Sequence, residues 1–214
     1  MVKQSKYCYA NTDILINNLN IKDDNILNFA ERELVALRMC ELDITPIKGM
    51  FDFEHLKLIH KHLFQDIYEW AGNIRKCIIA KEDLYCLPEY INDSAKEIFE
   101  KLKKKYYMNY EYEKKVLKLA GLFSDINALH PFREGNGRTQ REFIEELAKI
   151  NGINLDLTVV DQNNIVLASH NSINGNNKAL EKIFKKHSIR LTKDEQMKYI
   201  NTFCSNDMKN EIFV

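Results

Sequence analysis

The sequence predicts a mainly α-helical bundle with one small β-hairpin. Only 3 Pro and 7 Gly occur among 214 residues, so few positions interrupt a helix. Apolar residues recur at the spacing of a helix face through most of the chain. The stretch 74–88 instead carries two short runs typical of strands. The length suits one well-buried domain with a short tail.

Composition narrows the classes of partner and the cellular setting. The 31 Lys and Arg balance 31 Asp and Glu, which leaves no basic footprint for direct nucleic-acid binding. The 5 cysteines show neither CxxC nor metal-type spacing and are interpreted as reduced thiols. We find no signal-peptide pattern and no apolar run of transmembrane length. We therefore expect a cytoplasmic protein without a membrane segment.

The chain divides into a lead-in, one domain and a tail. Residues 1–25 form a polar lead-in, and residues 26–190 hold the periodic segments. Residues 191–214 lose the periodicity, which predicts a frayed or partly helical tail. The first helix is predicted over 26–42 and the second over 53–67. His55, His60 and His62 in the second helix lack the ligand spacing of a metal site, so we interpret them as core or surface histidines.

The hairpin is predicted to pair residues 77–79 with 84–86 around a turn at 81–83. An isolated hairpin is marginally stable, so we expect it to serve a purpose, with a decorative loop as the alternative. Apolar residues then cover most of the circumference of residues 111–128, which marks a central buried helix. The other helices are predicted over 91–105, 139–150, 156–169 and 179–184, with a polar linker at 171–177.

One stretch combines the parts of a phosphate site: His130-Pro131-Phe132-Arg133-Glu134-Gly135-Asn136-Gly137-Arg138-Thr139-Gln140-Arg141. Gly135 and Gly137 permit positive φ and close backbone approach, so N–H groups can converge on an anion. The N-terminus of the following helix adds partial positive charge. Arg138 and Arg141 fall on one face of that helix and can both reach an oligophosphate.

Two further side chains of this stretch predict its chemistry. Glu134 would repel phosphate unless a bridging Mg²⁺ lies between them. His130 carries the only group in the stretch that ordinarily takes up a proton near neutral pH. We therefore predict nucleotidyl or phosphoryl transfer to an incoming hydroxyl, with His130 as the general base. A lone Gly-x-Gly is more often a turn, but the ordered occurrence of all these groups favours a site.

The stretch resembles the signature of the Fic family, His-x-Phe-x-Asp/Glu-Gly-Asn-Gly-Arg-x-x-Arg, and matches it at every defined position. The resemblance extends outward to Ile67-Tyr68-Glu69-Trp70-Ala71-Gly72 and to about residue 190. It is strongest to small bacterial Fic toxins that work with a separate antitoxin. It implies a Fic-type helical bundle in which residues 74–88 are the flap.

The resemblance implies transfer of AMP from ATP to a hydroxyl of a target protein, with release of pyrophosphate. His130 would deprotonate the hydroxyl, and Glu134 would hold Mg²⁺ on the α- and β-phosphates. The nucleotide-binding set would be the backbone N–H groups and Asn amide of Gly135, Asn136 and Gly137, with Arg138 on the phosphate tail and Arg141 on the γ-phosphate. The Arg of Gly-Asn-Gly-Arg favours AMP transfer over phosphorylation, while transfer of UMP or phosphocholine stays open.

The resemblance also implies a partner at the flap. The flap edge would pair with an extended segment of the target, and Lys81 and Glu82 at its turn would approach the nucleotide. By analogy with short bacterial Fic toxins, subunits of DNA gyrase or topoisomerase IV are the first candidate targets.

The last expectation concerns regulation. Fic proteins are commonly held inactive by the Glu of a Ser/Thr-x-x-x-Glu-Gly/Asn motif, and no Ser or Thr of this chain has Glu four residues on. The resemblance therefore suggests that a small antitoxin supplies the inhibitory Glu to a toxin. A secreted effector that modifies host proteins and a non-enzymatic nucleotide-binding module are the alternatives.

Overall fold

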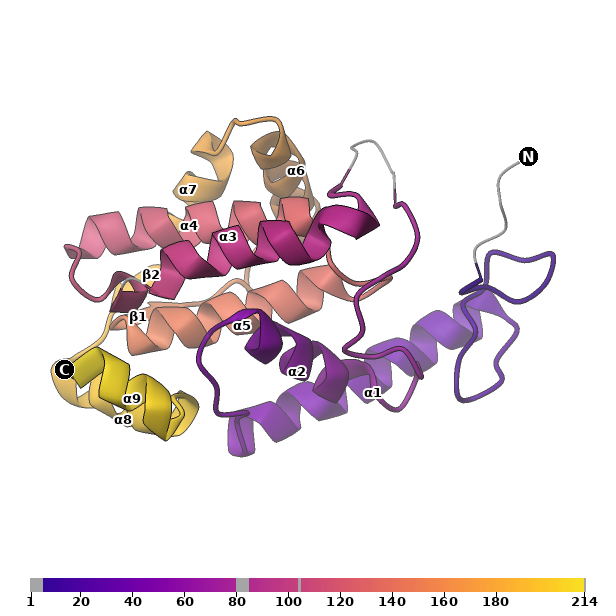
Figure 1. The fold of residues 1–214 in the computed structure, drawn as a ribbon, viewed down its shortest axis with the longest axis horizontal. Helices are drawn as coiled ribbons and strands as arrows, with labels where there is room; N and C mark the ends of the chain where they lie inside the picture. The colour runs from indigo at the N-terminus through magenta and orange to yellow at the C-terminus, as the bar shows by residue number, and fades with distance from the viewer. Residues whose placement is uncertain (1–5, 80–84, 104, 214) are drawn as a thin grey trace.

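The fold is a helical bundle built around two central helices (Figure 1). A computed structural model describes residues 6–79, 85–103 and 105–213. The central pair, α4 (Tyr112–Leu129) and α5 (Asn136–Ile150), pack against each other, and both bury a broad apolar surface. The loop between them, residues 130–135, carries the first half of the motif. The mainly α-helical prediction is confirmed.

The N-terminal helices cover α5. Helix α1 (Asp24–Ile44) packs on α2 (Phe53–Phe64), and α2 packs on α5. Both helices begin where an aspartate side chain accepts a hydrogen bond from a first-turn N–H group, Asp23 from Ile26 and Asp52 from His55. The predicted helices at 26–42 and 53–67 therefore exist with nearly the predicted bounds.

Three further helices surround α4: α3 (Ile91–Lys103), α6 (Gln162–Ile173) and α7 (Lys178–Lys186). Helix α6 begins six residues later than position 156, because Asp161 caps it through the N–H groups of Asn163 and Asn164. Short 3-10 helices, Pro88–Tyr90 and Lys105–Tyr107, flank α3. Strand β1 (Ile153–Leu155) pairs antiparallel with β2 (Ser188–Arg190), with Asn154 opposite Ile189.

The C-terminal residues are helical and folded onto the bundle, so of the two predicted alternatives, a frayed or a partly helical tail, the frayed one is wrong. They form α8 (Lys193–Phe203) and α9 (Asn206–Phe213), and α8 packs on α5. Thr192 and Glu195 form a capping box at the start of α8. Ile200, Phe203 and Met208 bury their side chains. The apolar positions are few, which is why the helical period is faint in the sequence.

The predicted hairpin differs from the structure in the residues that can be compared. Residues 74–79 and 85–87 have no strand pairing, and the two-stranded sheet of the described residues is the one formed by β1 and β2. The predicted turn, with Lys81 and Glu82, lies outside the described residues. We call residues 74–79 and 85–87 the two flap stems. One backbone hydrogen bond joins each stem to the motif side of the bundle, from Arg75 N–H to the Pro131 carbonyl and from Cys86 N–H to the Ala128 carbonyl.

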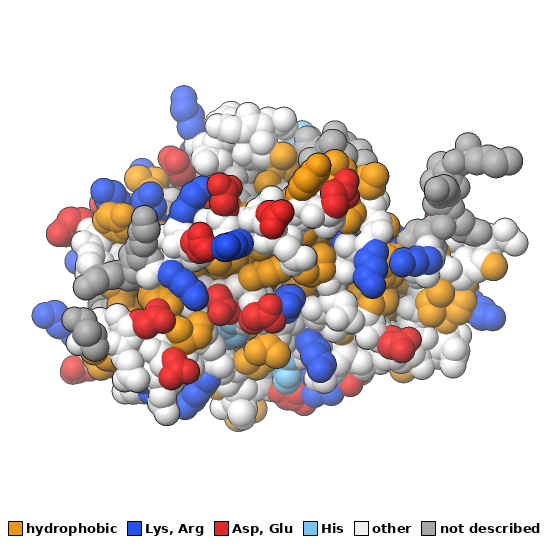
Figure 2. Space-filling view, in the orientation of Figure 1, with side chains coloured by type: hydrophobic (Ala, Val, Ile, Leu, Met, Phe, Trp, Pro, Cys, Tyr) orange, Lys and Arg blue, Asp and Glu red, His pale blue; other side chains and the backbone are white. Residues whose placement is uncertain are grey.

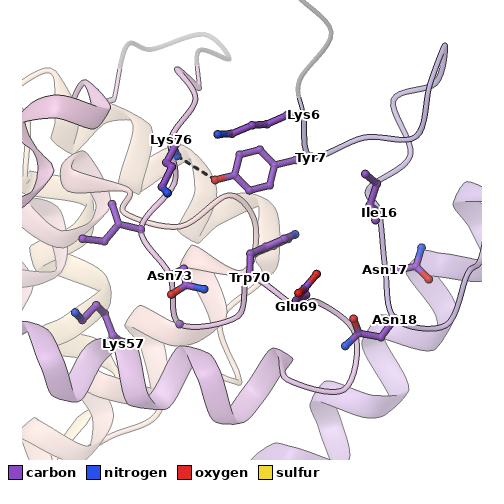
Figure 3. Close-up of a pocket in the computed structure, with 12 residues that line it drawn as sticks. Lys6, Tyr7, Ile16, Asn17, Asn18, Lys57, Glu69, Trp70, Asn73 and Lys76 are labelled. Carbon is purple, nitrogen blue, oxygen red and sulfur yellow. Dashed lines mark hydrogen bonds between the residues drawn. The ribbon is translucent and has the colours of Figure 1, made fainter.

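The segment before α1 closes over the loop that leads into the flap region (Figure 3). The Tyr7 hydroxyl accepts a hydrogen bond from the Lys76 backbone N–H at 3.0 Å. The Tyr7 ring meets Trp70 edge to face, with 5.9 Å between centroids. A cavity of about 730 Å³ lies between this segment and residues 69–76. The N-terminal lead-in is therefore structured from residue 6 onward.

The surface has no dominant charge on the face shown in Figure 2, where acidic and basic side chains are interspersed. This distribution matches the equal numbers of basic and acidic residues in the sequence. Among the described residues, every helix falls short of the length and apolarity that a membrane crossing requires.

Candidate active site

His130 lies at the point where α4 ends. Its backbone is left-handed, with φ 44° and ψ 59°, and its N–H donates to the Ile126 carbonyl at 3.0 Å. This geometry ends a helix, and Pro131 prevents its continuation. A non-glycine residue in this conformation carries strain of about 1–2 kcal/mol, which the surrounding contacts must hold. The imidazole stacks on the Tyr85 ring with 3.8 Å between centroids.

Arg75 fixes the backbone of His130 and both stems of the flap region. Its side chain is 1% exposed. The guanidinium donates to the carbonyl of His130 at 2.7 Å, to that of Cys77 at 2.7 Å, and to that of Cys86. Burial lowers the pKa of Arg75, but a guanidinium still stays charged. Three carbonyl dipoles thus stabilise one buried positive charge beside the motif.

Asn136 closes the loop that follows His130. Its side-chain Oδ1 accepts from the Phe132 N–H at 2.9 Å, and its Nδ2 donates to the Phe132 carbonyl at 2.8 Å. The residue is 6% exposed. Both ends of the amide therefore bind the protein's own backbone. The sequence prediction that the Asn amide cradles phosphate is not matched by this geometry, and Asn136 acts by shaping the loop.

The two glycines of the motif are required for different reasons. Gly135 has φ +80°, and an added Cβ would lie 2.2 Å from Cζ of Phe64. Gly137 is in the first turn of α5, outside the left-handed region, and an added Cβ would meet nothing nearer than Nη1 of Arg141 at 3.9 Å. The predicted positive φ holds for Gly135 only. The protein leaves room at Gly137, so packing does not account for the missing side chain, whereas close approach of a ligand would.

His60 supports the same loop from α2. Its Nδ1 accepts from the Gly72 N–H at 2.8 Å, so the proton is on Nε2, which donates to the Glu134 carbonyl at 3.0 Å. The ring stacks on Phe132 with 3.8 Å between centroids. Burial lowers the pKa of His60 to about 3, so the ring is neutral at physiological pH. The interpretation of His60 as a core histidine is confirmed.

Five of the predicted site residues line one cavity of about 430 Å³: His130, Glu134, Asn136, Gly137 and Arg141. His130, Glu134 and Gly137 line it on the motif side, and α6 lines the opposite side through Ile165 and Ser169. Arg141 also lines it, and no ion pair to a carboxylate of the described residues is found for its guanidinium. Burial lowers the pKa of Arg141, which indicates a partly desolvated cation facing the cavity. Such a group suits an anionic ligand.

Arg138 occupies a different position from the one predicted. Its guanidinium lines a second, polar cavity of about 410 Å³ and is absent from the lining of the first. It donates to Glu31 of α1 at 2.5 Å and lies 3.8 Å from Glu134. Glu134 and Arg133 line both cavities. The two arginines of the motif therefore point to opposite sides of Glu134.

Glu134 fits the role of a magnesium ligand. Its Oε1 accepts from the Gly135 N–H at 2.9 Å, and its side chain is 43% exposed, at the edge of the first cavity. Mg²⁺ in phosphate sites takes one or two carboxylates, and its other ligands are phosphate oxygens and water. One accessible carboxylate beside an anion cavity matches that set. No cluster of three or more metal-ligating side chains is found among the described residues, so a fully protein-made site is not seen there.

Four residues that contact or line the candidate site were not identified as such from the sequence: Glu31, His60, Arg75 and Gln140. The first three act through partners far away in the chain. Gln140 lines the first cavity, is 4% exposed, and has a buried Oε1 without a hydrogen-bond partner among the described residues. A buried acceptor of this kind requires a donor, which a nucleoside can supply. Its position inside the motif was the only available signal.

Comparison with known proteins agrees with this geometry. The profile of the Fic/DOC family matches residues 50–148, which span α2 to most of α5. The chain is 36% identical over 188 residues to the protein adenylyltransferase VbhT of Bartonella schoenbuchensis, covering 87% of this chain and 39% of VbhT. It is 38% identical over 171 residues to a Sinorhizobium fredii protein named probable protein adenylyltransferase y4lH, covering 78% of this chain and 88% of that protein.

A solved structure supports the same conclusion for the fold. The Fic domain of a VirB-translocated Bep effector protein from Bartonella quintana, determined with bound ADP, superposes with a TM-score of 0.80. It is 25% identical in sequence and covers 89% of this chain and 97% of that one. The chain thus spans less than half of VbhT but nearly the whole of this effector Fic domain.

Proposed function

The chain belongs to the Fic/DOC family, and from that membership we propose that it transfers AMP from ATP to a hydroxyl of a target protein. The observation that carries the proposal is the cavity in which His130 and Glu134 face Gly137 and Arg141. A general base, an acidic ligand and an anion-binding helix start converge there, as nucleotidyl transfer requires.

We assign the protein groups as follows. His130 takes the proton of the target hydroxyl while its oxygen forms a bond to the α-phosphorus of ATP. The bond from that phosphorus to the bridging oxygen of pyrophosphate breaks, and pyrophosphate leaves with the electron pair. Glu134 would hold Mg²⁺, which neutralises phosphate charge when bound. The α5 N-terminus at Gly135, Asn136 and Gly137 contributes N–H groups to the phosphates, and Arg141 binds the phosphate tail.

Arg138 contacts two glutamates, Glu31 and Glu134, and its proposed role depends on them. The motif predicts contact between the Arg138 guanidinium and the phosphate tail, but here the guanidinium lies behind Glu134. We propose that Arg138 affects the site through its distance from the Glu134 carboxylate. Lys81 and Glu82 remain proposed nucleotide contacts in a segment outside the described residues.

The proposed partners, a target protein and an antitoxin, also rest on membership of the Fic/DOC family. We propose that an extended segment of the target docks beside the flap stems, because Ile79 and Tyr85 line the cavity that holds His130. DNA gyrase and topoisomerase IV subunits are the first targets to test. A small antitoxin that supplies a glutamate to Arg141, a cytoplasmic setting and a role as the toxin of the pair complete the proposal.

A labelling experiment tests the transferred group and the base. The chain is incubated with Mg²⁺, a bacterial lysate and ATP labelled at either the α- or the γ-phosphate. We expect a protein band labelled from α-labelled ATP only, and at least about 100-fold less label with His130→Ala, since a general base contributes about 10²–10⁴-fold. His187→Ala, at the end of α7 and outside the cavity lining, is the matched control. Label from the γ-phosphate, or equal labelling by the His130 variant, would overturn the proposal.

A further inference from the structure

Glu31 is a buried carboxylate that α1 delivers to the motif. It is 7% exposed, although it lies in a helix whose neighbouring positions are largely solvent-facing. Its Oε1 accepts from Nη2 of Arg138 at 2.5 Å, and its Oε2 accepts from the Tyr68 hydroxyl. Burial, together with the nearby carboxylate, raises the pKa of Tyr68, so the hydroxyl stays a donor. Both oxygens of Glu31 are therefore held in one orientation.

Two carboxylates compete for the guanidinium of Arg138. Nη2 is 2.5 Å from Glu31 but 3.8 Å from Oε1 of Glu134, which lies in the loop four residues before it. The Phe64 ring lies under the guanidinium, with 4.8 Å to the ring centroid. Arg138 is thus held by Glu31 and a flat aromatic face, and its ion pair with Glu134 is the longer one and is not a hydrogen bond.

This arrangement affects what Glu134 can bind. Glu134 lies in the loop just before α5, four residues from Arg138, and a glutamate and an arginine so placed can form a hydrogen-bonded ion pair. A direct pair would place a cation on the carboxylate that a divalent ion also needs. Because Glu31 takes the hydrogen bond of Arg138, the Glu134 carboxylate stays accessible, with 43% of its side chain exposed.

We propose that Glu31 is a positioning residue that keeps Arg138 from hydrogen-bonding to Glu134 and thereby leaves the Glu134 carboxylate available to bind a divalent cation with the nucleotide phosphates. The inference rests on the proposed function, because it takes Glu134 as the cation ligand. Glu31 does not touch the cation or the nucleotide. It acts only through Arg138, which makes its effect separable from that of a ligand.

A purely structural ion pair between α1 and α5 would have a different signature. Its loss would lower the melting temperature and leave the dependence of nucleotide binding on the metal unchanged. In the positioning role, loss of the Glu31 charge lets Arg138 pair with Glu134, and the metal-dependent part of nucleotide affinity falls. Removing Arg138 as well should then restore that part.

The test measures binding of the non-hydrolysable analogue AMPPNP by calorimetry, once with Mg²⁺ and once with EDTA. The quantity compared is the ratio of the dissociation constant in EDTA to that in Mg²⁺. The variants are Glu31→Gln, Arg138→Gln and the double variant, with Tyr68→Phe as the control that keeps the Glu31 charge. Unliganded melting curves establish that each variant is folded. If Glu31→Gln is not, Glu31→Asp takes its place, because its shorter side chain withdraws the carboxylate from Arg138 and should shift the ratio in the same direction.

We expect Glu31→Gln to lower the ratio about 10-fold, the scale on which residues behind a metal ligand act. The double variant should return to the ratio of Arg138→Gln alone, and Tyr68→Phe should stay near wild type. A ratio for Glu31→Gln equal to that of wild type would overturn the inference while leaving the proposed function standing. So would a double variant as low as Glu31→Gln. A wild-type ratio of one would remove the cation from the proposed function, and the inference with it.

Discussion

Alanine in place of Gly137 should separate nucleotide binding from folding. Gly137 lies in the first turn of α5 with helical backbone, and the nearest atom to an added Cβ is Nη1 of Arg141 at 3.9 Å. The free protein therefore has room for the methyl group. The neighbouring Gly135→Ala offers a matched contrast, because there φ is +80° and the added Cβ would lie 2.2 Å from Phe64.

The expected magnitudes follow from these geometries. Gly137→Ala removes backbone freedom from the unfolded chain and should stabilise the fold by about 0.5 kcal/mol, or about 1–2 °C in melting temperature. Gly135→Ala adds about 1–2 kcal/mol of left-handed strain and about 1–3 kcal/mol of overpacking, a loss of roughly 10 °C. For AMPPNP, the Gly137 methyl group would occupy the space through which phosphate reaches the α5 N-terminus. Its affinity should fall at least about 10-fold, since each 1.4 kcal/mol is tenfold.

Two assays on the same preparations check this reasoning. Differential scanning calorimetry gives the melting temperatures without ligand, and isothermal titration gives the AMPPNP dissociation constants. If Gly137→Ala binds AMPPNP as wild type does, the explanation of that glycine by ligand approach is refuted. If it instead melts several degrees lower, the residue serves the fold and the cavity argument fails.

Two further predictions concern buried charges. Arg75→Met leaves the carbonyls of His130, Cys77 and Cys86 without their donor and should cost about 3–5 kcal/mol, which urea unfolding would detect; a change below about 1 kcal/mol would contradict the role given to this arginine. Burial raises the pKa of Glu146 well above its ordinary range, so wild-type stability should fall as pH rises above about 4.5, by up to about 1.4 kcal/mol per pH unit until the folded-state pKa is reached. Glu146→Gln should lack that part of the slope in urea unfolding between pH 5 and 8, and equal slopes would show that Glu146 does not titrate differently on folding.

Much of the bundle could be predicted because its helices carry strong local signals. The apolar period located α1 to α4 within a few residues of their observed bounds. Helix α5 begins at Asn136, three residues before the predicted Thr139. The low helix propensity of glycine favours a loop at Gly137, but this residue is helical. Thr192 and Glu195 have the spacing of a capping box, which predicts a helix start there. Few apolar positions follow, so the helical period of α8 is weak in the sequence.

The site divides in the same way between local and long-range causes. The motif placed His130, Glu134 and Arg141 together because they are close in the chain and flank one helix start. The environments of Asn136 and Arg138 could not be predicted in this way. The side-chain amide of Asn136 hydrogen-bonds to the Phe132 backbone, and Arg138 donates to Glu31, which lies 107 residues earlier in the chain. Spacing predicts which side chains can meet, whereas competition between alternative partners is decided by packing.

The three hydrogen bonds of Arg75 to backbone carbonyls have a consequence for how a target is selected. One guanidinium donates hydrogen bonds to both flap stems and to the carbonyl of His130, the proposed base, so a displacement of either stem would also displace the His130 backbone. An extended segment docked along the flap would then meet the base at a constant separation, whatever its side chains. Adjacent residues of such a segment are about 3.3 Å apart and face opposite ways. The residue that is modified would therefore be selected by its position along the docked segment. A shift of one residue would turn the hydroxyl away from the base.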